Sequence, residues 1–169
     1  MNVKWIGAAM VVCAGGMIGF FKVLSHRREE RLLRQLIEAL NLMENQLQYH
    51  HSTLPELCRL VYEQLHEIGK CFLGLEQELN NQVMPVVGDC MNTVLKKMDS
   101  LPQSVQNNLT RLGASMGRFD LSGQLRDINA VRKQCEADLD KLLLNRDARL
   151  RGYQTLGLCA GVALAIILF

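Results

Sequence analysis

Apolar residues recur at steps of three and four along most of the chain, which is the spacing of one face of an α-helix. The clearest stripes lie at residues 32–47, 57–68, 72–83, 87–98, 105–112 and 121–142. The alternation of apolar and polar residues that marks a strand is absent from the sequence. The pattern predicts an all-α fold in which six helices form a bundle.

Two similar tetrapeptides precede apolar stripes, TLPE at residues 53–56 and SLPQ at residues 100–103. TLPE has the form of a capping box, in which Thr53 and Glu56 exchange side-chain and backbone hydrogen bonds. Pro55 is tolerated there because the first amides of a helix have no intrahelical acceptor. SLPQ is predicted to open its helix in the same way, and Gly69 is predicted to precede the helix that contains residues 72–83.

Both ends of the chain are apolar. Residues 5–24, WIGAAMVVCAGGMIGFFKVL, match the hydrocarbon core of a bilayer because a helix of this length spans about 30 Å. Residues 153–169 are shorter but carry no charge, and Tyr153 suits the membrane interface. We therefore expect a transmembrane signal anchor at 1–24, a helical bundle at 25–152 and a C-terminal transmembrane helix at 153–169. The alternatives are a cleaved signal peptide and a tail buried in the bundle core.

Arginines flank the bundle side of both apolar segments. They follow the first segment and precede the second, at Arg27, Arg28, Arg31, Arg34, Arg146, Arg149 and Arg151. The positive-inside rule then keeps the bundle in the cytoplasm and puts both termini across the membrane. Each apolar segment also contains a G-x-x-x-G motif, at Gly15 and Gly19 and at Gly157 and Gly161, which favours close packing of membrane helices.

Composition excludes several functions. The net charge of +2 is too small to indicate nucleic-acid binding. The cysteines outside the apolar ends are isolated from one another, which is typical of small buried hydrophobic residues in a reducing compartment; they are Cys58, Cys71, Cys90 and Cys135. No nucleotide, nucleophile or zinc-protease motif occurs, so we expect no catalytic, cofactor-binding or metal-binding residues and no enzyme. The rival interpretation is a membrane-anchored regulatory or metal-binding protein that uses His50, His51, Cys58 and His66.

The stretch RLGASMGRFDLSGQLRD, residues 111–127, interrupts the helical pattern. Gly113 is predicted to end one helix in a left-handed conformation, one residue after Leu112. Asp120 is predicted to cap the next helix, with Gln124 in its first turns. That helix keeps its register into the second apolar segment, and we expect it to pair with the first long helix as a bundle seam or a coiled coil.

The order L-G-x-x-x-G-x-x-D-x-x-x-Q, from Leu112 through Gly113, Gly117 and Asp120 to Gln124, resembles the stage III sporulation protein AB family. LPEL at residues 54–57 and R-G-Y-x-x-L-G at residues 151–157 extend the resemblance over the whole chain. The resemblance implies a component of the mother-cell-to-forespore complex in the outer forespore membrane of endospore-forming bacteria. It also implies a cytoplasmic domain similar to the helical domains of type II secretion platform proteins, which lie beside a secretion-type ATPase.

The resemblance also implies the partners: the ATPase is stage III sporulation protein AA, and the further partners are other stage III sporulation membrane proteins. The hypothesis is a non-enzymatic membrane platform, in which Gly113, Gly117, Asp120 and Gln124 face outward as a docking surface together with Pro55 and Glu56. A homo-oligomer is compatible with it, because secretion platforms carry two such domains and this chain carries one. A structural hairpin without a motor is the third alternative.

Overall fold

The computed structural model describes the backbone of residues 2–50, 52–81, 86–98, 100–116 and 121–168. It describes the side chains of residues 25–49, 52–81, 86–98, 100–116 and 121–144. The described residues form six helices and no strand: α1 (Asn2–His50), α2 (Leu54–Gln64), α3 (His66–Asn81), α4 (Val87–Lys97), α5 (Gln103–Ser115) and α6 (Leu121–Leu168). The all-α prediction is confirmed for this part of the chain.

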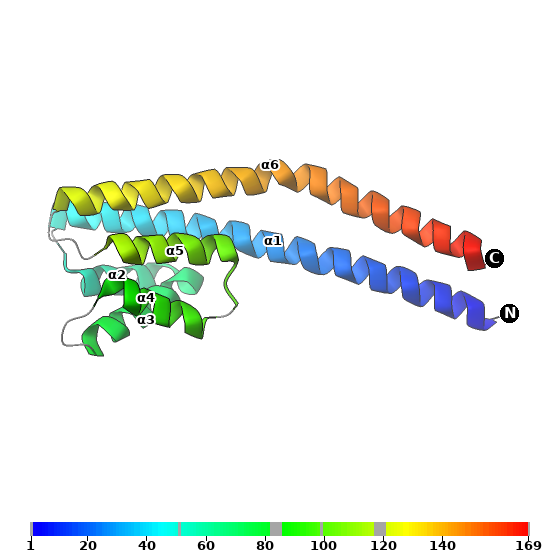
Figure 1. Cartoon of the computed structure of the whole chain (residues 1–169), viewed down its shortest axis with the longest axis horizontal. Helices are drawn as coiled ribbons and strands as arrows, with labels where there is room; N and C mark the ends of the chain where they lie inside the picture. Colours follow the sequence, from blue (N-terminus) through cyan, green and yellow to red (C-terminus); the bar gives the residue numbers. More distant parts are fainter. Residues whose placement is uncertain (1, 51, 82–85, 99, 117–120, 169) are drawn as a thin grey trace. The chain divides into compact units, whose positions relative to one another are not determined.

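The chain divides into two units. One unit consists of the outer ends of the two long helices, residues 1–28 and 140–169, and the other consists of Glu29–Leu139. The second unit, here called the helical unit, lies within the 25–152 bundle predicted from sequence. It contains α1 from Glu29, all of α2 to α5, and α6 up to Leu139 (Figure 1).

Within the residues that the structure describes, no helix contains a stretch long and apolar enough to cross a membrane. The side chains of the two predicted spans, with Gly15, Gly19, Gly157 and Gly161, lie outside the described residues. The transmembrane helices therefore stay predictions, although the backbone is helical over most of both segments.

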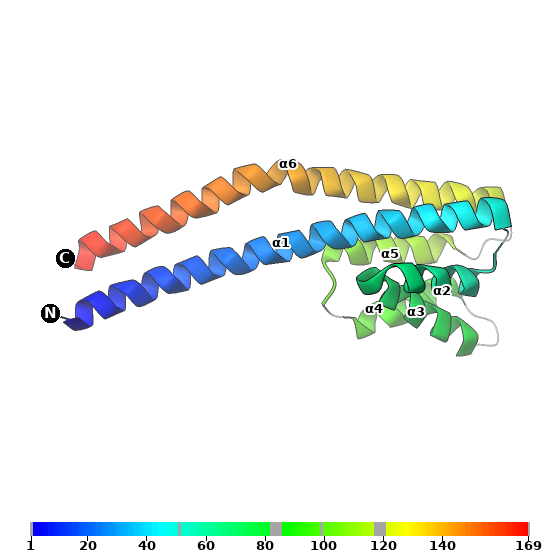
Figure 2. The same cartoon turned by 180° about the vertical axis from the view of Figure 1, so that it is seen from behind.

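In the helical unit, α1 and α6 run side by side in opposite directions, and α2 to α5 lie together on one side of this pair (Figures 1 and 2). The predicted apolar stripe of α1 is buried, with Leu33 and Ala39 added to it. Hydrogen bonds join α1 to α3, α5 and α6, among them Ile68 N–H to Gln35 Oε1 at 3.3 Å, Ser104 Oγ to Glu29 Oε1 at 2.6 Å, and Arg132 Nη1 to Asn41 Oδ1 at 2.8 Å.

The predicted capping box at the start of α2 is confirmed. The backbone N–H of Thr53 donates to Oε2 of Glu56 at 2.8 Å, and Pro55 lies in the first turn. This bond lowers the pKa of Glu56 because it favours the carboxylate form. Four residues close in sequence are enough to fix this helix start.

The predicted boundary at Gly69 is wrong. The break between α2 and α3 is the single residue Leu65, whose backbone is extended, and Gly69 is buried inside α3. A Cβ at Gly69 would lie 2.9 Å from the Cα of Tyr62 in α2. Glycine therefore permits the first turns of α3 to cross the end of α2 closely, and it does not end a helix here.

The second capping prediction is also wrong. Pro102 takes the N-cap position of α5, no side chain caps it, and the helix begins at Gln103. Leu101 is buried, its N–H donates to the carbonyl of Met98 at 3.3 Å, and Gln106 Nε2 donates to the Leu101 carbonyl at 2.9 Å. These contacts hold SLPQ as a turn. α5 therefore begins at the fourth residue of SLPQ, whereas α2 begins at the second residue of TLPE.

The predicted role of Gly113 as a helix end is wrong as well. α5 continues to Ser115, and its C-cap is Met116 in an extended conformation. Gly113 is buried, and a Cβ there would lie 2.6 Å from Cβ of Met91 and 3.5 Å from Cα of Gly88. Glycine at position 113 therefore permits the close packing of α5 on α4.

Candidate docking surface

The predicted docking residues differ from one another in how far their side chains are exposed. Gly113 is packed against Met91 and is not part of an outward surface. Gln124 is half-buried on α6, Glu56 is exposed in the first turn of α2, and Pro55 beside it is half-buried. Gly117 and the predicted cap Asp120 lie outside the described residues.

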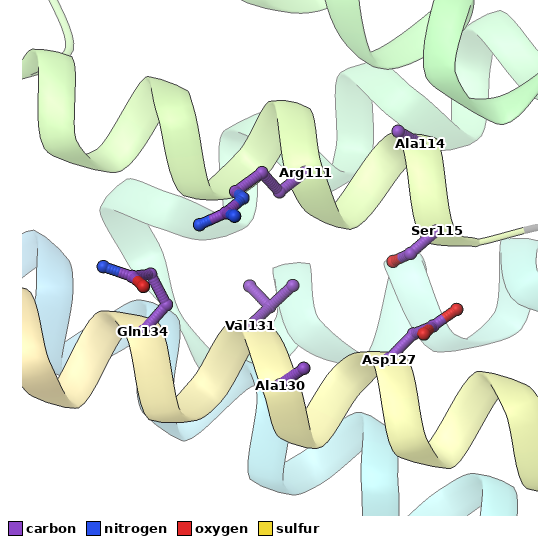
Figure 3. Close-up of a pocket in the computed structure, with 7 residues that line it drawn as sticks. All are labelled: Arg111, Ala114, Ser115, Asp127, Ala130, Val131 and Gln134. Carbon is purple, nitrogen blue, oxygen red and sulfur yellow. The ribbon is translucent and has the colours of Figure 1, made fainter.

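Close to the C-terminal end of α5, a groove of about 390 Å³ lies between α5 and α6 (Figure 3). The groove is lined by Arg111, Ala114, Ser115, Asp127, Ala130, Val131 and Gln134. Arg111 and Gln134 lie at one end, Ser115 and Asp127 lie at the other, and Val131 points up between them from α6. The size suits a few side chains of a bound segment, because ligand pockets typically measure roughly 300–1,000 Å³.

A buried polar cluster lies about one helical turn along the α5–α6 interface from Arg111 and Gln134. Asn108 is only 1% exposed, and its Nδ2 donates to the Ser104 carbonyl and to Oδ2 of Asp138, both at 3.0 Å. Gln134 Nε2 donates to the other oxygen of Asp138 at 3.0 Å. The cluster fixes the register of the two antiparallel helices, so the groove next to it has defined walls.

Small side chains keep the groove open. Ala114 on α5 and Ala130 on α6 are both exposed, whereas Val131 on α6 is buried. Longer side chains at the two alanines would fill the space between the helices. Sequence reasoning missed this feature because exposed alanines are ordinary in a helix, and only the fold brings these two to the same groove.

The rim of the groove carries positive charge. Arg111 is exposed and is the one charged residue in α5. On α6, Arg126 and Lys133 are exposed four residues before and three residues after Ala130, so all three share one helix face. Among the described residues, none of these three cations forms a salt bridge.

The metal-site alternative gains no support from the described residues. Cys58 is buried, and burial raises the pKa of its thiol to about 12, with a further contribution from Glu76. A thiol with such a pKa is a poor metal ligand at neutral pH. His66 is exposed at the start of α3, while the side chain of His50 and the whole of His51 lie outside the described residues. In that part of the chain, no group of three His, Cys, Asp or Glu side chains is arranged to hold a metal ion.

Comparison with known proteins identifies the family. A profile described as stage III sporulation protein AB matches residues 4–169. A solved structure titled "Stage III sporulation protein AB (SpoIIIAB)" is similar, with a TM-score of 0.63 and 24% identity over 72% of this chain and 98% of that chain. A comparison with curated proteins gave no match. The structural likeness supports the fold, and because the profile spans nearly the whole sequence, the chain belongs to the stage III sporulation protein AB family.

Proposed function

We propose that this protein is a non-enzymatic membrane platform of the mother-cell-to-forespore complex, and that it docks a secretion-type ATPase. The observation that carries the proposal is the family match over residues 4–169. The match covers the helical unit and both apolar ends together. The proposal therefore assigns one role to the whole chain.

Attachment to the outer forespore membrane rests on the two apolar ends. Each is long enough, or nearly so, to cross a hydrocarbon core, and arginines flank each on the bundle side. α1 and α6 each continue as one helix from the helical unit into an apolar end. A helical unit that two helices anchor on the mother-cell side of the membrane could bind a cytoplasmic ATPase at a fixed position.

Docking of the ATPase rests on the surface at the α5–α6 end of the helical unit. The buried cluster around Asn108 makes that surface rigid, and a preorganised surface loses less conformational entropy on binding. The partner that the family resemblance implies is stage III sporulation protein AA. Other stage III sporulation membrane proteins, and a second copy of this chain, are the further partners in the proposal.

The test uses the full chain in detergent and purified stage III sporulation protein AA. Both proteins are produced separately, mixed, and passed over a size-exclusion column with light scattering to give the mass of each complex. We expect the ATPase to co-elute with the platform at a fixed ratio. Separate elution at micromolar concentrations, with the platform still helical by circular dichroism, contradicts the docking proposal.

A further inference from the structure

The α5–α6 groove combines three features that suit a protein segment: an apolar floor, polar ends and a cationic rim. We propose that this groove, and not the turn that follows α5, receives an acidic segment of the partner ATPase. The inference rests on the docking function proposed above and names its site and the chemistry of its ligand.

Charge complementarity selects an acidic ligand. Arg111, Arg126 and Lys133 are all exposed, and among the described residues they form no salt bridge with the chain itself. Glu136 is also exposed on α6, four residues after Arg132 and three after Lys133, but it does not line the groove. The exposed face of α6 around Ala130 thus presents two cations, Arg126 and Lys133, to an approaching partner, while Asp127 and Gln134 line the groove itself.

The lining also sets the direction of the ligand. A carboxylate of the bound segment belongs beside Arg111, where a guanidinium can make charge-assisted hydrogen bonds. The carboxylate of Asp127 lies at the other end of the groove, near Ser115 (Figure 3). A second carboxylate of the ligand would be repelled at that end. One apolar side chain fits between the ends, over Val131 and between the two alanines.

An anionic membrane surface is the competing ligand for a cationic rim, and the groove favours the protein segment. An anionic membrane attracts a basic protein surface through the net charge of that surface, and this attraction needs no cavity in the protein. Here Arg111 lines a groove with two small residues, Ala114 and Ala130, and Arg126 and Lys133 share the helix face of Ala130. This is the form of a site that accepts an individual side chain.

The experiment measures the dissociation constant between purified stage III sporulation protein AA and the full chain in detergent. Arg111→Glu reverses the rim charge, and Ala130→Leu fills the groove from an exposed position. We expect each to weaken binding roughly tenfold or more, because each replaces a favourable contact by repulsion or a clash. We also expect the wild-type affinity to fall as salt is raised, and to fall less steeply in Arg111→Glu.

Two control variants match the test variants. Lys70→Glu makes the same change of charge at an exposed lysine on α3, outside the groove. Ala137→Leu makes the same change of size at an exposed alanine on α6 that does not line the groove. Both are expected to bind as the wild type does. Circular dichroism and thermal unfolding show that all four variants are folded.

The outcomes separate the two proposals. If the wild type binds the ATPase and both groove variants bind equally well, the groove is not the site, and docking itself stands. If the wild type does not bind, the docking function fails and the groove inference fails with it. If Arg111→Glu and Ala130→Leu weaken only the association with vesicles of anionic lipid, the rim faces a membrane and the inference is overturned.

Discussion

Glycine residues in this bundle serve close helix packing. At Gly69 and Gly113 an added Cβ would meet Cα of Tyr62 at 2.9 Å and Cβ of Met91 at 2.6 Å. Neither neighbour is the flexible end of a side chain, so the backbone itself would have to move. At Gly88 the nearest atom would lie 3.6 Å away, which is an ordinary contact.

This difference gives a matched pair of variants. We expect Gly113→Ala to lower the free energy of unfolding by roughly 1–3 kcal/mol, because it overpacks the α4–α5 crossing. Gly88→Ala, in the same crossing, should change it by less than about 1 kcal/mol, since alanine fits there and favours helix. Urea unfolding of the full chain, followed by circular dichroism, measures both. Equal effects would show that the crossing tolerates a methyl group.

The buried thiols give a second prediction at this scale. Burial raises the pKa of Cys58 and of Cys135 to about 12, so almost no thiolate forms at pH 8. We expect both to react with a thiol reagent at least a hundredfold more slowly in the native protein than in urea. Mass spectrometry of labelled peptides provides the rates. Rapid native labelling at Cys58 would indicate an open site and would revive the metal-binding alternative.

At residue scale, the sequence predicts a feature correctly when the residues that cause it are close together in the sequence. The Thr53–Glu56 capping box is set by four adjacent residues, and it was predicted correctly. Gly113 was misassigned because a glycine after an apolar stripe has the same appearance whether it ends a helix or packs against another. The reason for that glycine is Met91, 22 residues away, and only the fold reveals it.

At the scale of elements, the start of α2 is expected to depend on pH. The bond from the Thr53 N–H lowers the pKa of Glu56 in the folded chain below its unfolded value. Its contribution to stability is therefore present above the unfolded pKa and is lost as pH falls through the folded pKa. Glu56→Gln keeps a hydrogen-bond acceptor but does not titrate.

The prediction is that Tm falls more steeply between pH 6 and pH 3 in the wild type than in Glu56→Gln. Other carboxylates contribute to both curves, so the difference between them isolates Glu56. Differential scanning calorimetry at several pH values measures it. Parallel curves would mean that the carboxylate does not stabilise α2.

The α5–α6 register gives another prediction. Asp138→Ala removes one acceptor of the buried Asn108 amide, and an unsatisfied buried donor costs roughly 1–3 kcal/mol. Glu63→Ala removes an exposed pair with Arg59, and such pairs contribute about 0–1 kcal/mol. We expect chemical unfolding to show the larger loss for Asp138→Ala. A smaller loss there would mean that the cluster does not fix the interface.

Elements were predicted well where one periodic stripe defines them, as in α4, and less well at their ends. The helix starts at the second residue of TLPE but at the fourth residue of SLPQ, where Leu101 is buried in the core whereas its counterpart Leu54 is half-buried. The α5–α6 groove has no sequence signal of its own. Arg111 and Ala130 come from different helices, and their meeting depends on the crossing of those helices.

At the scale of the whole molecule, the proposal is a helical unit held in the mother cell by two membrane helices. The all-α fold and the family follow from the sequence, because long apolar stripes and the order of short motifs extend over the whole chain. Membrane attachment is a proposal that rests on hydropathy and flanking arginines alone. The proposal therefore depends most on which side of the membrane the helical unit lies.

The most direct measurement is cysteine labelling in intact sporulating cells with a membrane-impermeant maleimide. Lys70→Cys places an exposed thiol on α3, in a chain with Cys13→Ala and Cys159→Ala, while the remaining cysteines are buried. We predict that the protein sediments with membranes and that Cys at position 70 is labelled only after permeabilisation. Labelling in intact cells, or recovery of the protein in the soluble fraction, would contradict the platform proposal.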